Sequence, residues 1–374
     1  MAKSLRLFYV YVLTKKENMK SKFLLVLMAL LPMATLITVT SCGDDDEIVQ
    51  PPVNNNSNNG SNTDDNGSGD NNGDNSGNEN TGQEVPEIVV VVNEDGTTSN
   101  GSIFSAIDDK NFYVDYIKYT VEEGHLAVSG YDKAGFKGVA NIISKLTYKG
   151  NTYEVLTIGE DAFKRCTVMT SVTIPNNVTS IGSNAFYGCS SLTSIAIPNN
   201  VTSIGDYAFS GCSGLTSVTI PGSVTSIGGF AFFGCSSLTS INISDLASWC
   251  NISFSGFQSN PLRMARHLYV NGKEITDLVI PEGVIRIRNY AFLCCTSLTS
   301  VTVPNGVTSI GDSAFEDCSS LTSVIVKATT PPTIGYYTFS YHINVTLYVP
   351  VGCKAAYQAA QYWKDFKAII EIEM

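Results

Sequence analysis

Histidine, basic residues and cysteine are scarce in this 374-residue chain, and each shortage excludes a class of function. Three histidines leave little material for a histidine-based metal cluster. The chain has 34 acidic against 23 basic residues, and its formal net charge is −11. This balance argues against a general nucleic-acid binder, which would need a basic face. Ten cysteines are too few for the disulfide scaffold of a small secreted domain.

Long apolar runs are scarce as well. The stretch at residues 23–37, FLLVLMALLPMATLI, is about 15 residues long, whereas a membrane-spanning helix needs roughly 20. Lys20 and Lys22 precede it, and small residues follow it up to Cys42. A basic start, a short apolar run and a small-residue exit are typical of a secretory signal. We therefore predict that residues 1–41 are a signal peptide, with Met19 as an alternative start.

The end of this signal, Val39-Thr40-Ser41-Cys42, resembles the lipobox of bacterial lipoproteins. In that family the cysteine thiol receives a diacylglyceryl group and becomes the new N-terminus. The resemblance implies lipidation at Cys42; the alternative is an ordinary cleavage site with an incidental cysteine. Residues 44–47 are all acidic and resemble the tag that sends some such lipoproteins to the outer face of the outer membrane. We expect an outer-membrane protein that faces the cell exterior and touches the membrane only through its lipid.

The segment that follows Cys42 has the composition of a tether. Residues 43–85 consist mostly of Asp, Asn, Gly, Ser and Glu, with ten acidic residues and no basic one. Such a segment cannot bury enough apolar surface to offset its chain entropy. We predict that residues 42–85 are the lipidated cysteine followed by a disordered linker.

The rest of the chain repeats itself every 23 residues. Ile195 and Ile197 alternate with small residues, which predicts a short strand, and Pro198 ends it because proline has no N–H for the next ladder bond. Self-similarity at this length predicts a solenoid, in which each coil buries its apolar edges against its neighbours. An Ala-Phe pair marks the register of the repeat at Phe163, Phe186, Phe209, Phe232, Phe292 and Phe315, and Phe339 follows 24 residues later.

Solenoids need caps that cover their terminal apolar faces. We predict an N-terminal β cap at residues 86–157, with a strand at 88–92 and a hairpin that turns at Gly150-Asn151. The solenoid of short parallel strands should cover residues 158–350. Residues 351–374 should form a C-terminal cap helix and a tail, because Ala356, Ala360, Trp363 and Phe366 have near-helical spacing.

The repeat pattern L-x-x-(I/V)-x-I-P-x-x-V-x-x-I-G-x-x-A-F-x-x-C resembles the leucine-rich repeats of the BspA-like bacterial surface proteins. The resemblance covers about residues 112–368. It implies a curved leucine-rich repeat solenoid with a parallel sheet on one side, used for binding at cell surfaces. Members of the family are associated with adhesion to host proteins and to other cells. The fold carries over better than the ligand, because the family is diverse.

One unit departs from the pattern and forms an irregular insert at about residues 244–270, without the Ala-Phe pair or the repeat cysteine. One interpretation is a protruding loop that touches a ligand, since inserted loops on rigid scaffolds often carry function. The other is an irregular coil whose aromatic residues fill the gap left by the missing phenylalanine. The candidate contacts in this insert are Trp249, Phe257, Arg263 and Arg266.

The outward positions of the predicted strands form a field of small hydroxyl groups. From residue 158 to 330 there are only eight basic and ten acidic residues, so such a face would bind by many weak hydrogen bonds and by shape. The alternative is a solvated sheet in which threonine merely suits a strand. The candidate face comprises Ser171, Thr173, Ser194, Ser217, Thr219, Ser240, Asn242, Ser300 and Thr302.

The cysteines that follow the repeat are expected to be small buried core residues rather than a metal or disulfide ladder. They are Cys166, Cys189, Cys212, Cys235, Cys295 and Cys318. No pairing is predicted for Cys250, Cys294 and Cys353. The three histidines do not share a carboxylate pattern. We predict no catalytic residue, metal or cofactor.

Together these features predict a lipid-anchored, surface-exposed, non-enzymatic protein for adhesion or binding to host or other cell-surface macromolecules. A carbohydrate-binding accessory lipoprotein is one alternative, because small polar faces with scattered aromatics also suit glycans. A structural spacer without a ligand is another.

Overall fold

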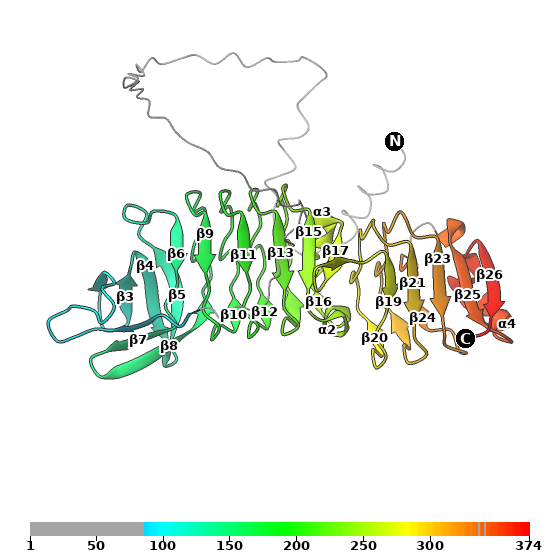
Figure 1. Ribbon diagram of the computed structural model, residues 1–374, viewed down its shortest axis with the longest axis horizontal. Helices are drawn as coiled ribbons and strands as arrows, with labels where there is room; N and C mark the ends of the chain where they lie inside the picture. The colour runs from blue at the N-terminus through cyan, green and yellow to red at the C-terminus, as the bar shows by residue number, and fades with distance from the viewer. Residues whose placement is uncertain (1–85, 336, 340–341) are drawn as a thin grey trace, which may run out of the picture. The chain divides into compact units, whose positions relative to one another are not determined.

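The computed structural model describes residues 86–335, 337–339 and 342–374, which fold as a stack of short coils (Figure 1). The predicted signal peptide, Cys42 and the acidic linker lie outside the described residues. No helix within the described ranges combines the length and the apolar character that crossing a bilayer requires.

Residues 86–158 form strands that run directly into the first coil. β2 to β5 are a meander of antiparallel strands, β5 pairs in parallel with β8, and β8 pairs in parallel with β10 of the solenoid. The hairpin turn lies one residue earlier than expected, because Tyr148 pairs with Asn151 and the turn is Lys149-Gly150. The strands are β1 (Val89–Val91), β2 (Phe104–Ala106), β3 (Asn111–Val114), β4 (Ile117–Glu122), β5 (His125–Tyr131), β6 (Val139–Asn141), β7 (Lys145–Tyr148) and β8 (Asn151–Ile158).

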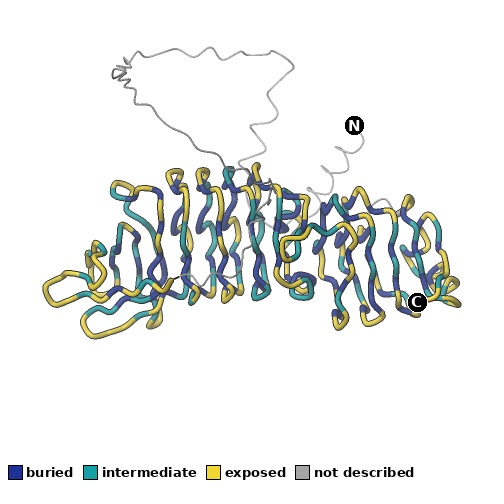
Figure 2. Tube along the Cα trace, viewed as in Figure 1, coloured by how far each residue is buried: buried dark blue, intermediate teal, exposed yellow. Residues whose placement is uncertain are grey.

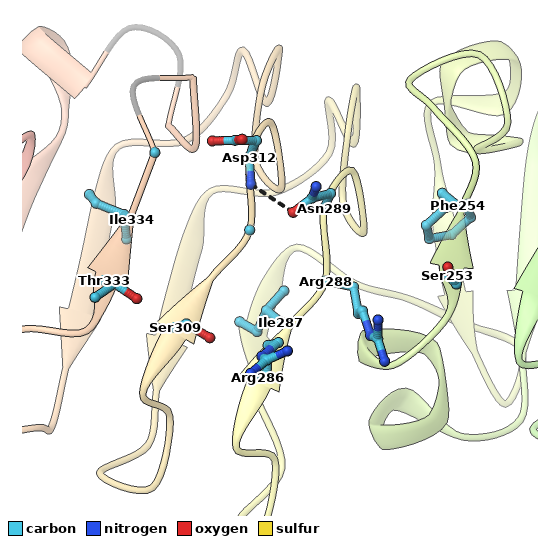
Figure 3. Close-up of a pocket in the computed structure, with 12 residues that line it drawn as sticks. Ser253, Phe254, Arg286, Ile287, Arg288, Asn289, Ser309, Asp312, Thr333 and Ile334 are labelled. Atoms are coloured by element: carbon cyan, nitrogen blue, oxygen red, sulfur yellow. Dashed lines mark hydrogen bonds between the residues drawn. The ribbon is translucent and has the colours of Figure 1, made fainter.

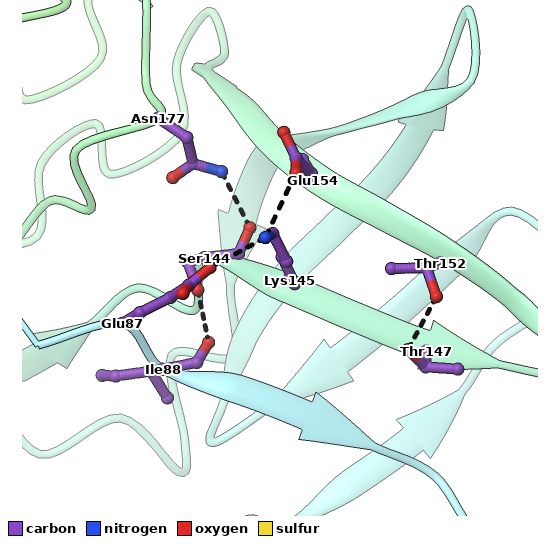
Figure 4. Close-up of polar contacts among 8 residues, drawn as sticks. All are labelled: Glu87, Ile88, Ser144, Lys145, Thr147, Thr152, Glu154 and Asn177. Atoms are coloured by element: carbon purple, nitrogen blue, oxygen red, sulfur yellow. Dashed lines mark hydrogen bonds and ion pairs between the residues drawn. The ribbon is translucent and has the colours of Figure 1, made fainter.

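Polar contacts join the N-terminal strands to the first coil (Figure 4). Ser144 Oγ donates a hydrogen bond to the carbonyl oxygen of Ile88 at 2.9 Å, and Asn177 Nδ2 donates to the carbonyl oxygen of Ser144 at 2.9 Å. Lys145 Nζ lies 3.0 Å from Glu87 Oε1. Because Ile88 directly precedes β1 and Asn177 follows β9, the contacts of Ser144 connect the two segments.

Each regular coil contributes one longer and one shorter strand, and within each sheet strands of the same kind pair in parallel from coil to coil. Ser194 lies opposite Ser217, which lies opposite Ser240, and Ser180 lies opposite Ser203. The 23-residue solenoid with short parallel strands is therefore confirmed. The longer strands are β9 (Ser171–Thr173), β11 (Ser194–Ala196), β13 (Ser217–Ile220), β15 (Ser240–Ile243), β17 (Leu268–Val270), β19 (Asp277–Val279), β21 (Ser300–Val303), β23 (Ser323–Val326) and β25 (Thr346–Pro350). The shorter strands are β10 (Ser180–Ile181), β12 (Ser203–Ile204), β14 (Ser226–Ile227), β16 (Ser253–Phe254), β20 (Arg286–Ile287), β22 (Ser309–Ile310) and β24 (Thr333–Ile334).

Buried residues recur in every coil of the stack (Figure 2). The repeat phenylalanines are among them, and their rings stack on one another from coil to coil. The ring centroids of Phe186 and Phe209 are 5.3 Å apart and nearly parallel, and those of Phe209 and Phe232 are 5.1 Å apart. The stack resumes between Phe292 and Phe315 at 5.1 Å. Aromatic pairs at this separation add stability beyond the area that they bury.

The repeat cysteines are buried beside this stack, as expected. The Sγ of Cys212 donates a hydrogen bond to the carbonyl oxygen of Phe186 at 3.1 Å, and Cys235 does the same with Phe209 at 3.2 Å. Each such thiol therefore joins its own coil to the preceding coil.

The stacked sheets are interrupted after the insert. The longer-strand sheet ends at β17 and the hairpin strand β18 (Lys273–Glu274) and restarts at β19, while the shorter-strand sheet ends at β16 and restarts at β20. Residues 244–270 form a complete coil, made of α2 (Leu246–Cys250), β16, α3 (Leu262–Ala265) and β17. Both of its strands pair with the preceding coil, so the insert belongs to the stack.

Side chains of the insert replace missing backbone donors. In a regular coil the N–H of Phe209 donates to the carbonyl oxygen of Ala231 in the next coil at 2.8 Å. The corresponding carbonyl oxygen of Ala291 instead accepts from Trp249 Nε1 at 2.8 Å and from Asn260 Nδ2 at 3.1 Å. This arrangement supports the interpretation of the insert as an irregular coil that compensates for the absent Ala-Phe pair.

The C-terminal residues differ in part from the predicted helix and tail. The helix α4 (Lys354–Ala359) is shorter than expected, Ala356 is exposed, and Tyr357 is the buried residue of that helix. After the 3₁₀ turn η2 (Trp363–Asp365), the tail forms β26 (Ala368–Ile372), which pairs in parallel with β25. The aromatic rings of Trp363 and Phe366 lie 5.8 and 5.5 Å from the ring of Phe339. A further 3₁₀ turn, η1 (His342–Asn344), precedes β25.

Candidate functional site

The predicted hydroxyl face lies on the outer side of the longer strands, but the structure divides it among three sheets. Ser194, Ser217 and Ser240 line up across β11, β13 and β15, and Thr219 lies opposite Asn242. Ser171 and Thr173 belong to a separate two-stranded sheet of β6 and β9. Ser300 and Thr302 lie on β21, in the sheet that begins at β19. All nine positions are exposed or half-buried.

Two kinds of hydroxyl column can be separated by their hydrogen bonds. The threonines that directly precede the strands are structural: Thr216 Oγ1 donates to the carbonyl oxygen of Thr193 at 3.2 Å, and Thr239 Oγ1 donates to that of Thr216 at 3.3 Å. Thr299 and Thr322 repeat this contact. Within the described residues, no side-chain hydrogen bond joins the hydroxyl groups of the candidate face on β11 to β15 to another residue. Those groups therefore remain available to solvent or to a ligand.

In the sheet that begins at β19, the first residue at the serine position is an aspartate, Asp277. Asp277 lies opposite Ser300 and accepts hydrogen bonds from Ser300 Oγ at 2.6 Å and from Thr299 Oγ1 at 3.1 Å. These bonds, led by that of Ser300, lower the pKa of the exposed Asp277 carboxyl. The charge makes this end of the face chemically different from the neutral field on β11 to β15.

The four candidate contacts of the insert have different surroundings. Trp249 is only 1% exposed and packs in the core, so its role is structural rather than ligand-contacting. Phe257 is 43% exposed, and the guanidinium carbon of Arg263 lies 5.0 Å from the centre of its ring. Arg266 is exposed in a left-handed conformation at the end of α3. A surface contact by the insert would therefore involve the Phe257–Arg263 pair or Arg266.

A groove of about 470 Å³ lies on the shorter-strand side, where that sheet is interrupted (Figure 3). Its lining includes Ser253 and Phe254 of β16 on one side and Arg286, Arg288 and Asn289 on the other. Figure 3 shows the Arg288 side chain between β20 and β16. The groove extends past the next coils along Ser309 and Thr333.

The sequence reasoning missed this groove, although the sequence contains a signal for it. Regular coils read Ser-Ile-Gly at the shorter strand, as in Ser203-Ile204-Gly205, whereas residues 286–288 read Arg-Ile-Arg. A substitution that breaks two repeat columns at once marks a coil with a special environment. Only the structure shows that this coil borders the gap in the sheet.

The buried thiols do not have the properties of nucleophiles. Burial raises the pKa of Cys235 to about 12 and that of Cys295 to about 11, so both are neutral thiols near pH 7. His267 Nδ1 lies 2.6 Å from Glu274 Oε1 on the exposed hairpin. In the part of the chain that the structure describes, there is no group of three or more His, Cys, Asp or Glu that could hold a metal ion.

Comparison with known families identifies the repeat. The model of the BspA type leucine-rich repeat region, in six copies, matches residues 136–263 and 263–350, more than half of the chain. A search of curated proteins found no match.

Several solved structures are similar. A leucine-rich repeat protein from Bacteroides capillosus is 29% identical and covers 37% of this chain and 100% of its own, with a TM-score of 0.34. A leucine-rich cell surface protein from Faecalibacterium prausnitzii is 21% identical and covers 72% of this chain and 97% of its own, with a TM-score of 0.29. For a leucine-rich repeat protein from Bacteroides ovatus the identity is 23%, the coverages are 69% and 88%, and the TM-score is 0.28.

Proposed function

This chain belongs to the BspA-type leucine-rich repeat family of bacterial surface proteins, and we propose that it is a lipid-anchored adhesin for host or other cell-surface proteins. Leucine-rich repeat solenoids typically serve as binding scaffolds rather than as enzymes, because stacked coils provide long, regular surfaces. In this proposal, Cys42 carries the lipid, the acidic linker provides distance from the outer membrane, and the coils bind the partner.

The observation that carries the proposal is the unbonded hydroxyl column on β11, β13 and β15. This column consists of one serine per coil, Ser194, Ser217 and Ser240, and their hydroxyl groups have no hydrogen-bond partner within the described residues. The hydroxyl groups of the adjacent threonines, in contrast, donate to backbone carbonyl oxygens. An array of equivalent weak sites favours an extended or repetitive partner, because simultaneous engagement multiplies affinity without a new kind of contact. The coils contain no lysine or arginine between Arg165 and Arg263, so binding there should depend little on salt.

The test replaces four candidate residues, Thr173, Ser194, Ser217 and Thr219, together by lysine. Their inward neighbours are untouched, and exposed substitutions usually change stability by less than about 0.5 kcal/mol each. Binding to a panel of immobilised extracellular-matrix proteins should fall at least tenfold, while wild-type binding should persist at high salt.

The matched control places four lysines on exposed serines in the turns of the same coils, at Ser190, Ser191, Ser236 and Ser237. This variant adds the same charge outside the strands and should bind like the wild type. Normal binding by the first variant, together with loss of binding in Phe257→Ala or Arg263→Ala, would assign adhesion to the insert. Absence of binding to the matrix panel, with binding on a glycan array instead, would favour a carbohydrate-binding protein.

A further inference from the structure

The groove between β16 and β20 contains two arginines that break the repeat. The regular coils have serine at the first position of the shorter strand and glycine two residues later. In regular coils there is no room for a side chain at this glycine, because a Cβ at Gly205 would come within 2.6 Å of the backbone nitrogen of Ser183 in the preceding coil. Arg288 stands at the position where regular coils have this glycine. A long side chain fits there because β20 does not pair with β16, and the space between the two strands is therefore open.

Both arginines are exposed to the groove rather than neutralised. Arg286 on β20 and Arg288 directly after it are both exposed and line the groove, whereas Ile287 between them is buried. No ion pair joins Arg286 or Arg288 to a carboxylate among the described residues. Asp312 also lines the groove, and its backbone N–H is bonded to Asn289 Oδ1 at 3.0 Å (Figure 3). The groove therefore presents two free guanidinium groups on a chain whose net charge is −11.

We propose that this groove binds an acidic polysaccharide, and that Arg286 and Arg288 pair with its carboxylates. The planar guanidinium group matches a carboxylate with two parallel hydrogen bonds. From Arg286 the groove continues past Ser309 and Thr333 of the next two coils, so an extended ligand can lie along the stack. The hydroxyl group of Ser253, on the other side of the gap, is exposed and has no side-chain hydrogen bond within the described residues, so it can contact a sugar hydroxyl.

The alternative ligand for two arginines is an acidic peptide, and the groove suits it less well. A peptide that adds to a sheet edge needs a run of free backbone groups. β16 and β20 are two residues long, and the N–H that follows β20, that of Arg288, already donates to the carbonyl oxygen of Cys250 at 2.9 Å. Phe254, the one aromatic residue in the lining, is only 7% exposed, so anchors for apolar peptide side chains are few.

The test uses the full-length protein and isothermal titration with oligogalacturonate, a polymer that carries one carboxylate per sugar. The matched ligand is the methyl-esterified oligomer, which has the same chain without the charge. Poly-glutamate represents the acidic peptide. We expect oligogalacturonate to bind at least tenfold more tightly than the ester or poly-glutamate, and to weaken as salt is raised, because exposed charges are screened.

Two double variants test the arginines. Arg286→Ser with Arg288→Gly restores the repeat sequence, and Arg286→Gln with Arg288→Gln keeps the length of the side chains in case the restored repeat packs differently. Both should reduce binding of oligogalacturonate at least tenfold. Lys273→Ser with Lys327→Ser removes the same charge from exposed positions outside the groove and should change binding less than twofold.

Equal binding of the ester, no binding of oligogalacturonate, or the same loss in the lysine control would overturn the proposal. Preferred binding of poly-glutamate would replace the polysaccharide by a peptide and would overturn it as well. The groove is separate from the hydroxyl face on β11 to β15, so failure here leaves the proposed adhesion unaffected. The lysine variant of the hydroxyl face should still bind oligogalacturonate.

Discussion

The indole Nε1 of Trp249 donates a hydrogen bond to the carbonyl oxygen of Ala291 at 2.8 Å, across the gap between β16 and β20 where the shorter-strand sheet is interrupted. The contact joins the irregular coil to the first regular coil that follows it. It is supplemented by Asn260 Nδ2 on the same oxygen at 3.1 Å. At this carbonyl oxygen, side chains therefore provide the bond that a backbone N–H provides between regular coils, as Phe209 does to Ala231.

Trp249→Phe should destabilise the solenoid. The variant removes a buried donor and leaves space in the core, and the free energy of unfolding should fall by about 1–3 kcal/mol. Urea denaturation followed by circular dichroism would measure the change. Phe257→Leu, at an exposed position of the same insert, is the control and should shift the midpoint little. Equal midpoints for Trp249→Phe and the wild type would contradict the bridging role.

Gly205→Ala should be far more damaging than Gly256→Ala. The added Cβ at Gly205 would lie 2.6 Å from the backbone nitrogen of Ser183, and backbone atoms cannot move aside cheaply. At Gly256 nothing lies within 4 Å of the added Cβ. Thermal unfolding should therefore show a clear drop in Tm for the first variant and little change for the second. Similar Tm values for the two variants would mean that neighbouring coils are less closely stacked than described.

Stability should fall in alkaline solution because of the buried thiols. Burial raises the pKa of Cys235 from its ordinary value of 9.0 to about 12, while the thiol of the unfolded chain ionises near the ordinary value. The contribution of the folded thiol is fully present below about pH 9 and is lost as the pH rises toward 12, because only the unfolded state releases the proton.

The measurement is the denaturation midpoint of the wild type and of Cys235→Ala between pH 7 and about pH 10.5. The variant should be less stable at pH 7, because it loses a buried side chain, and its stability should fall less steeply above pH 9. Parallel slopes for the two proteins would show that the Cys235 thiol does not titrate differently in the folded state.

The repeat thiols should also react slowly. Cys212 is buried and bonded to the carbonyl oxygen of Phe186, whereas Cys353 is partly exposed. Alkylation of the native protein by iodoacetamide, followed by mass spectrometry, should label Cys353 well before Cys189, Cys212 or Cys235. The same unreduced peptides should contain no Cys189–Cys212 or Cys212–Cys235 disulfide. Such links in most molecules would reverse the assignment of these residues as core thiols.

Cys42→Ala should release the protein from the membrane fraction. The lipobox-like end of the signal motivates this expectation, and stable anchoring needs more than one acyl chain, which a lipidated N-terminal cysteine would supply. Fractionation of cells that express either form would decide. Cys353→Ala serves as a control that should leave the distribution unchanged. Continued membrane retention of Cys42→Ala would rule out lipid attachment at that residue as the anchor.

The sequence by itself determined the solenoid. Phe186, Phe209 and Phe232 must contact each other along a stack, because each coil exposes apolar edges that its neighbouring coils have to cover. The period of 23, the short strand at Ser194–Ala196 and the buried cysteines follow from that requirement and could be predicted. The outward positions of the candidate face followed as well, because side chains alternate along a strand.

Other features were decided only by tertiary contacts. The hydroxyl group of Thr216 is bonded to a carbonyl oxygen of the preceding coil, whereas that of Ser217 has no such partner. This difference depends on where each side chain lies relative to the preceding coil, and the residue type alone does not predict it. The C-terminal tail forms the strand β26 because the outer edge of β25 offers unpaired backbone groups with which it can pair. Arg286 and Arg288 were visible as departures from the repeat, but their shared groove exists only because the Trp249 coil follows its own spacing and leaves β16 and β20 unpaired. Where the repeat is regular, each residue has the same neighbours in every coil, so its packing can be predicted from the sequence. Where the repeat is interrupted, the packing depends on long-range contacts of the particular residues that replace the regular ones.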